Sequence, residues 1–436
     1  MTVAAVNLWG RRIGAVSVDG PTGVPAFQYT PEFARSGVQL APVQMPLRVE
    51  PYEFRALARL EAFKGLPGML ADALPDRWGQ TLVGAWLRSQ GRSEESFDVV
   101  ERLCYTGARG MGALDFEPAI EPTAAGGRDL RVDLLVELAN EVLSDREAFV
   151  AELARHPDEE EMRTILTIGT SAGGARPKAV IAYDEQTGRV RSGQVDAGEE
   201  FSHWLLKFDG VDKSGDHGLR DPQGWGALEY AYWKLARAAG IEMTESRLLE
   251  EHGRRHFMTR RFDRVGSTGK LHVQTVAALE HVDYDEPGIY GYEQAVALLR
   301  RLGLGTPEAE QLYRRMVFNV VARNQDDHVK NVAFMMGRDG AWRLSPAYDL
   351  TWSYKPGNRW LQAHQMTING KRDDFVADDL LHVARFAGLK RGRGAAILRE
   401  VTDVVGEWPR IADEVGIDEA MRDAARATHR LKLPRG

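Results

Sequence analysis

Two carboxylates and one amide in residues 326–349 have types and spacing that suit phosphoryl transfer. Asp326 stands five residues before Asn331, and Asp349 follows after two short apolar runs. Phosphoryl transfer needs an oxygen acceptor beside the attacking hydroxyl and hard oxygen ligands for Mg²⁺, because the transferred group is anionic. Asp326 would be that acceptor, and Asn331 with Asp349 would bind the metal. Lys330 would supply a cation that offsets charge on the transferred group.

The elements expected around these residues follow one another in the order of a kinase catalytic core. An apolar stripe at helical spacing over residues 312–321 predicts a helix that leads into the loop carrying Asp326. Apolar runs at 332–336 and 342–345 predict a β-hairpin that ends at Asp349. Kinases have the same order: a loop aspartate, an asparagine five residues later, a hairpin and a metal-binding aspartate.

Other interpretations of this segment stay open at this point. Asp327 is less suited than Asp326 to act as the base, because only Asp326 has the five-residue spacing to Asn331. Residues 326–328 could instead form a solvated turn after a helix. They could also bind a metal through His328, but no second histidine lies at ligand spacing.

A lysine within an apolar strand is a candidate contact for nucleotide phosphates. Alternation over Ser202 to Phe208 predicts a strand in which apolar groups surround Lys207, and an unpaired buried ammonium is unfavourable. Glu229 lies near the start of the next predicted helix, and protein kinases pair a strand lysine with a helix glutamate. Alternatively, Lys207 extends to solvent from a strand edge and Glu229 faces water.

A small-residue turn at residues 169–174 could approach phosphate oxygens closely. The β-branched run 164–168 predicts a strand entering this turn, and a second strand is expected from Ala179. Glycine and alanine leave room for backbone N–H groups to meet an anion, and Lys178 adds a positive charge. The segment is not a Walker A loop, because Ala175 stands where a lysine is required. A plain hairpin turn is the alternative interpretation.

The composition is that of a globular protein and excludes several classes. Of 436 residues, 43% are hydrophobic and 27% charged, with a net charge of −7, which argues against a globally basic nucleic-acid binder. Cys104 is the single cysteine, so an intrachain disulfide and a cysteine-based zinc site are excluded. No apolar run approaches the ~18 residues of a membrane span. The first residues lack the order of a signal peptide, so we expect a soluble cytoplasmic protein.

Four regions are expected from changes in pattern along the chain. Residues 1–120 read as a mixed α+β unit, in which the turn at 107–112 lacks the dinucleotide-binding glycine order and is interpreted as mobile. Residues 121–160 form a linker and a helix, which is expected over Leu130 to Leu153. Residues 161–264 form a nucleotide-binding lobe and residues 265–436 a helical lobe with the catalytic and metal-binding loops. The predicted fold class is α+β: a two-lobed protein-kinase-like fold with an added N-terminal α+β subdomain.

The chain resembles the HipA toxins of bacterial type II toxin–antitoxin modules, which are serine/threonine-protein kinases. The resemblance covers nearly the whole chain. Its N-terminal part is carried by Leu8–Gly14, Pro46–Arg48 and Gly68–Asp76, and its C-terminal part by Ser171–Lys178, Asp326–Asn331 and Ser345–Asp349.

The resemblance implies ATP and Mg²⁺ as cofactors and assigns roles to individual residues. Asp326 is similar to the catalytic base of the family. Lys330 is the second catalytic residue, as the cation that offsets charge on the transferred group. Ser171 matches the loop serine that such kinases autophosphorylate, which inactivates them. Lys207 resembles the ATP lysine, and Arg260 and Phe262 lie in the segment that meets the adenine through backbone atoms. The other implied nucleotide contacts are Gly173, Gly174, Ala175, Arg176, Pro177, Lys178, His328, Asn331, Tyr348 and Asp349, with Asn331 and Asp349 also binding Mg²⁺.

The resemblance also implies partners. Family members pair with a small helix-turn-helix antitoxin of the HipB type, and operator DNA is bound mainly through that antitoxin. Known substrates in the family include aminoacyl-tRNA synthetases, and no membrane partner is expected. Two other functions stay open: a small-molecule kinase of the aminoglycoside or choline kinase type, and a non-catalytic pseudokinase that acts as a co-repressor.

Overall fold

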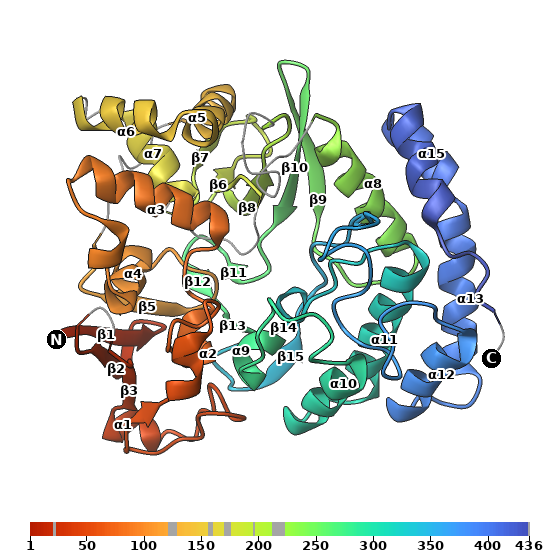
Figure 1. Ribbon diagram of the computed structural model, residues 1–436, viewed down its shortest axis with the longest axis horizontal. Helices are drawn as coiled ribbons and strands as arrows, with labels where there is room; N and C mark the ends of the chain where they lie inside the picture. The colour runs from red at the N-terminus through yellow and green to blue at the C-terminus, as the bar shows by residue number, and fades with distance from the viewer. Residues whose placement is uncertain are drawn as a thin grey trace. The chain divides into compact units, whose positions relative to one another are not determined.

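The computed structural model describes residues 1–20, 23–120, 129–155, 160–169, 176–194, 197–211 and 223–434. The chain divides into two compact units, one of residues 1–226 with 246–273 and one of residues 227–245 with 274–436. Figure 1 colours their elements from the N-terminus to the C-terminus.

The first unit begins with a five-stranded antiparallel sheet in the order β4-β3-β2-β1-β5. A tight turn at Trp9 and Gly10, whose φ angles are 51° and 77°, joins its first two strands. The sequence predicts this turn at residues 10–12, whereas Arg11 and Arg12 begin the second strand. Positive φ at both central residues is the geometry that matches strand twist in a two-residue hairpin. The strands are β1 (Thr2–Leu8), β2 (Arg11–Val18), β3 (Ala26–Tyr29), β4 (Tyr52–Glu53) and β5 (Leu114–Glu117).

Short helices connect and cover this sheet. Asp76 begins the longest of them, because its carboxylate accepts a hydrogen bond from Gly79 N–H at 2.7 Å. Asp98 begins α4 with a capping box that it shares with Glu101. The helices are α1 (Pro31–Ala34), η1 (Arg55–Arg59), α2 (Gly68–Ala71), α3 (Arg77–Ser89), η2 (Glu94–Ser96) and α4 (Val99–Thr106).

A second antiparallel sheet of the first unit has the order β7-β6-β8-β10-β9. Its apolar side chains, among them Trp204, share a core with Trp78 of α3 and Ile165 of α7. Figure 1 shows α5, α6 and α7 grouped beside β6 and β7. The elements are α5 (Val132–Ser144), α6 (Arg146–Arg155), α7 (Glu160–Ile168), β6 (Lys178–Tyr183), β7 (Val190–Ser192), β8 (Ser202–Lys207), β9 (Ser246–Glu251), β10 (Arg254–Arg260) and the short pair β11 (Arg264–Val265) and β12 (Gly269–Lys270).

The second unit is mainly helical around α11, whose residues 312–321 are all buried. A helix that is covered on all sides occupies the centre of its unit, and α13 and α10 pack against it. Its small sheet has the order β13-β14-β15. The elements are α8 (Trp225–Ala238) and β13 (His272–Thr275), both of which begin in the first unit, α9 (Val276–Glu280), α10 (Tyr292–Arg301), α11 (Thr306–Val321), η4 (Val329–Asn331), β14 (Ala333–Met336), β15 (Trp342–Leu344), α12 (Ala377–Phe386), α13 (Arg393–Gly406), α14 (Trp408–Val415) and α15 (Glu419–Thr428).

Two sequence-based predictions of secondary structure are wrong. Residues 164–168, predicted as a strand, form the end of α7, because Met162, Ile165 and Leu166 have helical spacing and are buried in the core. The single helix expected over Leu130 to Leu153 is two helices, α5 and α6. Asp145 separates them, since its carboxylate accepts the Ala148 N–H at 3.0 Å and so begins the second helix.

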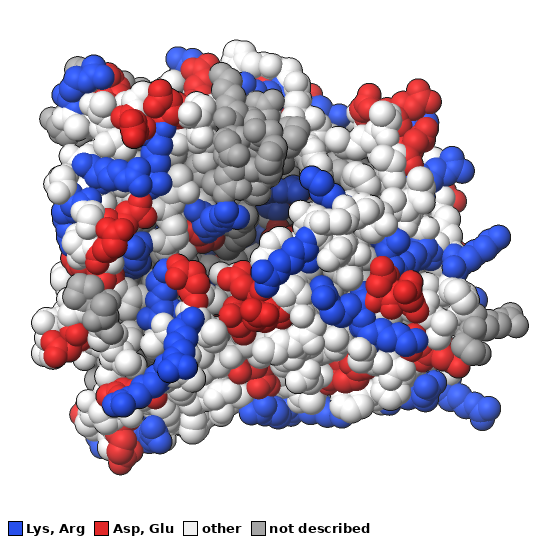
Figure 2. Space-filling view, viewed as in Figure 1, with Lys and Arg blue, Asp and Glu red and all other residues white. Residues whose placement is uncertain are grey.

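The surface carries mixed charge. On the face in Figure 2, the described lysine and arginine side chains are interspersed with aspartate and glutamate instead of gathering in one basic patch. This distribution agrees with the small net charge of −7. Among the described residues, no helix combines the length and the apolar character that crossing a bilayer would require.

Candidate active site

The loop with the predicted base leaves α11 through a left-handed turn. Arg323 has a φ of 58° and ends the helix, and the chain then runs beside residue 353. Gln325 N–H donates to the Ser353 carbonyl at 2.9 Å, and Ser353 N–H donates to the Arg323 carbonyl at 3.1 Å. These two backbone hydrogen bonds fix the start of the loop.

Asp326 and Asp327 have opposite surroundings. The Asp326 side chain is 48% exposed and its Oδ1 lies 3.9 Å from His328 Nε2. The Asp327 side chain is 1% exposed, and its carboxylate accepts hydrogen bonds from Tyr292, His364 and the Gln365 N–H at 2.8–2.9 Å. Burial alone would raise the pKa of Asp327, but the charge and hydrogen bond of His364 hold that pKa below its ordinary value. Of the two carboxylates, Asp326 is the one that can meet a substrate.

Asn331 is tied to the loop through its amide nitrogen. Its Nδ2 donates to the Asp326 carbonyl at 2.8 Å, and its N–H donates to the His328 carbonyl at 2.8 Å. The amide oxygen of Asn331 is therefore the atom that can ligate a cation. Lys330 lies beside it, with Nζ 4.7 Å from the centroid of the Tyr284 ring.

The predicted second aspartate lies close to this loop. Tyr348 O–H donates to the Lys330 carbonyl at 2.6 Å, and Asn324 Nδ2 donates to the Asp349 carbonyl at 3.4 Å. Asp349 has a φ of 53°, a conformation that costs free energy for a residue other than glycine. The second unit thus brings together Asp326, His328, Lys330, Asn331, Tyr348 and Asp349.

A buried arginine anchors the segment before Tyr348. Arg315 of α11 donates to the Ser345 carbonyl at 2.6 Å. Ser345 N–H in turn donates to the Ala333 carbonyl at 3.0 Å, which closes the hairpin of β14 and β15. Burial lowers the pKa of Arg315 to about 10, so the guanidinium stays charged at neutral pH.

The predicted nucleotide contacts of the first unit lie on strands β8 and β10. Lys207 is the last residue of β8, opposite Phe257 of β10, and its Nζ lies 5.8 Å from the centroid of that ring. Arg260 ends β10 opposite Trp204, and Phe262 follows two residues later. Glu229 belongs to the second unit, so its pairing with Lys207 stays a prediction.

Lys178 has a different environment from the one predicted. Its side chain is 2% exposed, and its Nζ lies 2.6 Å from Asp76 Oδ2. The same ammonium donates to the Arg176 carbonyl at 3.0 Å. Lys178 begins β6, and its charge is matched by a carboxylate of the N-terminal region. Its contact with a nucleotide stays a prediction.

Of the rest of the predicted small-residue turn, the structure describes only the last residues, Arg176 and Pro177. The Arg176 guanidinium lies 4.7 Å from the centroid of a Trp225 ring, and the Pro177 carbonyl accepts the Phe208 N–H at 3.2 Å. Ser171, Gly173, Gly174 and Ala175 lie outside the described residues.

Sequence reasoning missed a buried cluster next to Arg260 and Phe262. Asp263 is 2% exposed and pairs with Arg261 and Arg264, each at 2.6 Å. It also accepts the Gly112 N–H at 2.8 Å, while Arg264 Nη2 donates to the Gly110 carbonyl at 3.0 Å.

These bonds correct the interpretation of residues 107–112 as a mobile turn. Gly112 has a φ of 82°, and a Cβ there would lie 3.0 Å from Val273 N, so the turn packs closely. In the sequence, the charged run Arg-Arg-Phe-Asp-Arg at 260–264 was the signal that could have indicated the Asp263 cluster.

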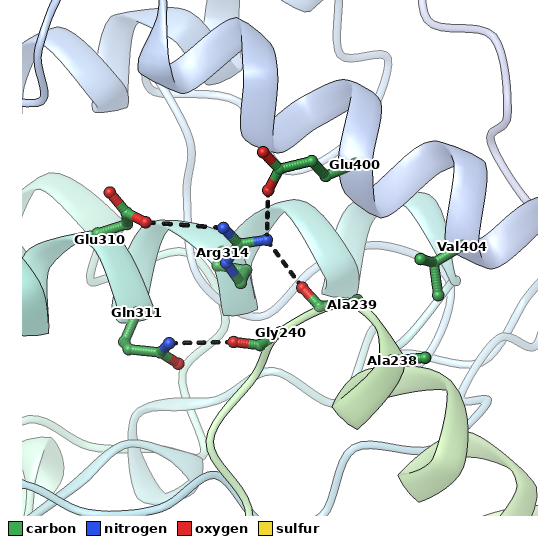
Figure 3. A pocket seen from close by; sticks show the side chains of 8 residues that line it. All are labelled: Ala238, Ala239, Gly240, Glu310, Gln311, Arg314, Glu400 and Val404. Carbon is green, nitrogen blue, oxygen red and sulfur yellow. Dashed lines mark hydrogen bonds and ion pairs between the residues drawn. The ribbon is translucent and has the colours of Figure 1, made fainter.

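The second unit also has a pocket away from these residues. It has a volume of about 410 Å³ and lies between α8, α11 and α13. Figure 3 shows Arg314 pointing into it and contacting the Ala239 carbonyl and Glu400, at 2.8 and 2.9 Å. Gln311 donates to the Gly240 carbonyl at 3.0 Å. Because Arg314 is already paired with neighbouring protein groups, we assign no ligand to this pocket.

Both parts of the chain match described protein domains. Residues 4–117 match the HipA N-terminal domain, and residues 170–408 match the HipA-like C-terminal domain. The second match alone spans more than half of the 436 residues.

A solved structure shares the fold over nearly the full length. HipA of Shewanella oneidensis MR-1, solved in a complex with HipB and operator DNA, has a TM-score of 0.67 and 17% identity. The match covers 97% of this chain and 94% of that chain. It confirms the predicted mixed helix-and-sheet fold of the HipA type. The Helicobacter pylori proinflammatory kinase CtkA has a TM-score of 0.35 and 11% identity, covering 59% of this chain and 90% of its own, which is too distant to support an argument.

A curated relative matches a shorter part of the chain. It is the Sinorhizobium fredii protein named "Putative kinase Y4dM", which is 27% identical over 176 residues. The match covers 37% of this chain and 42% of the relative, so this chain spans less than half of the relative's length.

Proposed function

The chain belongs to the HipA family, and from this premise we propose that it is an ATP- and Mg²⁺-dependent serine/threonine-protein kinase that acts as the toxin of a toxin–antitoxin module. One observation carries the proposal. Asp326 presents an exposed carboxylate on this loop, whereas the carboxylate of the adjacent Asp327 is buried and paired with His364. An exposed carboxylate that is held in place can accept the proton of an attacking hydroxyl.

The oxygen atoms beside Asp326 suit a hard divalent cation. Asn331 uses its amide nitrogen internally, which leaves its oxygen for a ligand, and Asp349 contributes a carboxylate. Bound between them, Mg²⁺ would offset the charge of the phosphates. The left-handed conformation of Asp349 supports a binding role, because strain of this kind is concentrated at functional sites. Lys330 and His328 would add positive charge and hydrogen-bond donors on the same loop.

Several of the proposed nucleotide contacts lie in the first unit. We propose that Lys207 contacts the phosphates of the nucleotide and that the backbone at Arg260 and Phe262 meets the adenine. Residues 173–176 would supply N–H groups to the phosphates, and Pro177, which has no N–H, would contact the nucleotide without donating. The cluster around Asp263 supports this proposal, since it fixes the chain directly after Phe262 through two arginines.

The proposed partner is a small helix-turn-helix antitoxin of the HipB type. The Shewanella HipA was solved with HipB and operator DNA, and this chain matches 97% of its own length to that protein. The net charge of −7 supports DNA contact mainly through the antitoxin. We propose a cytoplasmic protein substrate, with aminoacyl-tRNA synthetases as the first candidates, and autophosphorylation on Ser171.

The class of substrate can be tested directly. The purified protein is incubated with γ-labelled ATP and Mg²⁺, in one arm with cell extract and in the other with aminoglycosides and choline. Label on serine or threonine of a protein supports the proposal. Label on a small molecule alone would identify a small-molecule kinase, and absence of label in both arms would favour a non-catalytic co-repressor.

A further inference from the structure

A chain of buried polar side chains runs beneath the candidate active site. Tyr292 O–H donates to Asp327 Oδ2 at 2.9 Å, and Asn319 Nδ2 donates to the Tyr292 oxygen at 3.0 Å. Asn324 Nδ2 then donates to Asn319 Oδ1 at 2.9 Å and to the Asp349 carbonyl at 3.4 Å. The chain therefore connects the neighbour of Asp326 to the backbone of Asp349.

Each link of this chain is shielded from water. Counted over the whole residue, Tyr292 and Asn324 are 1% exposed, Asp327 is 3% and Asn319 is 6%. Hydrogen bonds in such surroundings are stronger than in water, and a chain of them polarises its members. Three of the four links donate in the direction of the Asp327 carboxylate, so its negative charge strengthens them, while the fourth runs from Asn324 to the Asp349 carbonyl. The raised pKa of Tyr292, caused by burial and by the charge of Asp327, keeps that hydroxyl protonated as a donor.

The same carboxylate also holds the segment after Asp349. His364 Nδ1 lies 2.8 Å from Asp327 Oδ2, and Gln365 N–H donates to Asp327 Oδ1 at 2.8 Å. Asp327 thus joins α10, the catalytic loop and residues 364–365 at one point.

We propose that Asp327, Tyr292, Asn319 and Asn324 are positioning residues that hold Asp326 and Asp349 at a fixed separation. The inference rests on the proposed function, because Asp326 and Asp349 act on the substrate and the metal only there. Transfer requires the base and the metal ligand to be placed correctly together, and a displacement of about 1 Å can reduce a rate on the order of 10²-fold. The four residues would not touch the substrate themselves.

Tyr292→Phe tests this proposal, because it removes the central hydroxyl and keeps the ring. Tyr290→Phe is the matched control: Tyr290 is also buried, and its hydroxyl has no hydrogen-bond partner among the described residues. We expect Tyr292→Phe to lower kcat at least about tenfold and to raise the Mg²⁺ concentration for half-maximal rate. The KM for ATP at saturating Mg²⁺ should change less than kcat, since the proposed contacts at Lys207, Arg260 and Phe262 lie outside this chain of side chains. Equal kcat and Mg²⁺ dependence in the two variants would overturn the proposal.

A second substitution in this chain of side chains and a second kind of measurement complete the test. Asn324→Ala should lower kcat by a similar factor. Combining it with Tyr292→Phe should lower kcat little further, because either substitution alone already disconnects Asp327 from Asp349. Fully additive losses would contradict the proposal. Hydrogen exchange of residues 326–331 and 348–350 should be faster in Tyr292→Phe than in Tyr290→Phe, and unchanged exchange would overturn it. This comparison needs no activity, so an inactive wild-type protein would refute the proposed function while the exchange still decides the inference.

Discussion

Asp326 and Asp327 are adjacent in the chain, yet one is 48% exposed and the other 1%. The spacing to Asn331 favours Asp326 as the base, but the sequence gives no reason for the burial of Asp327. That burial comes from Tyr292 and His364, each more than 30 residues away in the chain. Local spacing can therefore nominate a carboxylate, while partners that are distant in sequence determine its environment.

Asp349→Ala should chiefly weaken Mg²⁺-dependent binding of ATP. The change removes a hard oxygen ligand from the proposed metal site, so ATP affinity should lose its dependence on Mg²⁺. Calorimetric titration with ATP, with and without Mg²⁺, measures this. Asp339→Ala, in the turn between β14 and β15, is the control because its carboxylate is exposed. An Asp349→Ala protein with the Mg²⁺ dependence of the control would refute the metal role.

Ser171 should carry phosphate in protein that has been made in active form. A phosphate adds about −1.5 to −2 charges, which would repel the anionic triphosphate and weaken ATP binding. Mass spectrometry of the tryptic peptide that begins at Thr164 locates the group and distinguishes Ser171 from Thr170. The prediction fails if this peptide stays unmodified after prolonged incubation with ATP and Mg²⁺ in protein that phosphorylates other substrates.

At the scale of elements, periodicity predicted most of what surrounds the candidate site. The α11 helix, the β14–β15 hairpin, β8 and α8 follow the expected patterns, because the apolar residues of each are buried at the spacing that the sequence shows. Periodicity failed at 164–168, where burial on α7 overrides the preference of β-branched residues for strands. The ion pair of Lys178 with Asp76 was also beyond sequence reasoning, since its partners are about 100 residues apart.

The Asp263 cluster should be important for stability. The Arg261 and Arg264 charges hold the pKa of Asp263 below its ordinary value, although burial, the largest effect, acts to raise it. Asp263→Asn removes one partner of a buried charge network, which typically costs about 3–5 kcal/mol of unfolding free energy. Asp129→Asn, which breaks an exposed pair with Arg191, should cost less than about 1 kcal/mol. Urea denaturation compares the two, and equal losses would contradict the role of the cluster.

At the scale of the whole molecule, two buried histidines, His256 and His272, and two partly buried ones, His281 and His429, should make stability depend on pH. Burial lowers the pKa of His272 to about 3 and the pKa values of His256, His281 and His429 to about 4. Below about pH 6.5 the unfolded chain binds protons at these positions and the folded chain does not. Above about pH 6.5 these histidines therefore do not lower the free energy of unfolding. As the pH falls from 6.5 toward their folded pKa values, that free energy decreases by up to about 1.4 kcal/mol per pH unit for each histidine.

His272→Gln should reduce this dependence on pH. The unfolding free energy of the variant, measured by urea denaturation at pH 7 and pH 5, should fall less between the two values than that of the wild type. His252→Gln is the control, because the His252 side chain is 69% exposed. A slope in His272→Gln equal to that of the control would show that His272 does not contribute.

The central claim is that Asp326 is the base for phosphoryl transfer, and Asp326→Asn tests it most directly. The measurement is the initial rate of γ-phosphate transfer from ATP to protein in the presence of Mg²⁺, with Asp339→Asn as the control for an exposed carboxylate nearby. Loss of a positioned base should lower this rate about 10²–10⁴-fold while the thermal unfolding midpoint stays that of the wild type. A folded Asp326→Asn protein that transfers phosphate at the rate of the control would contradict the account.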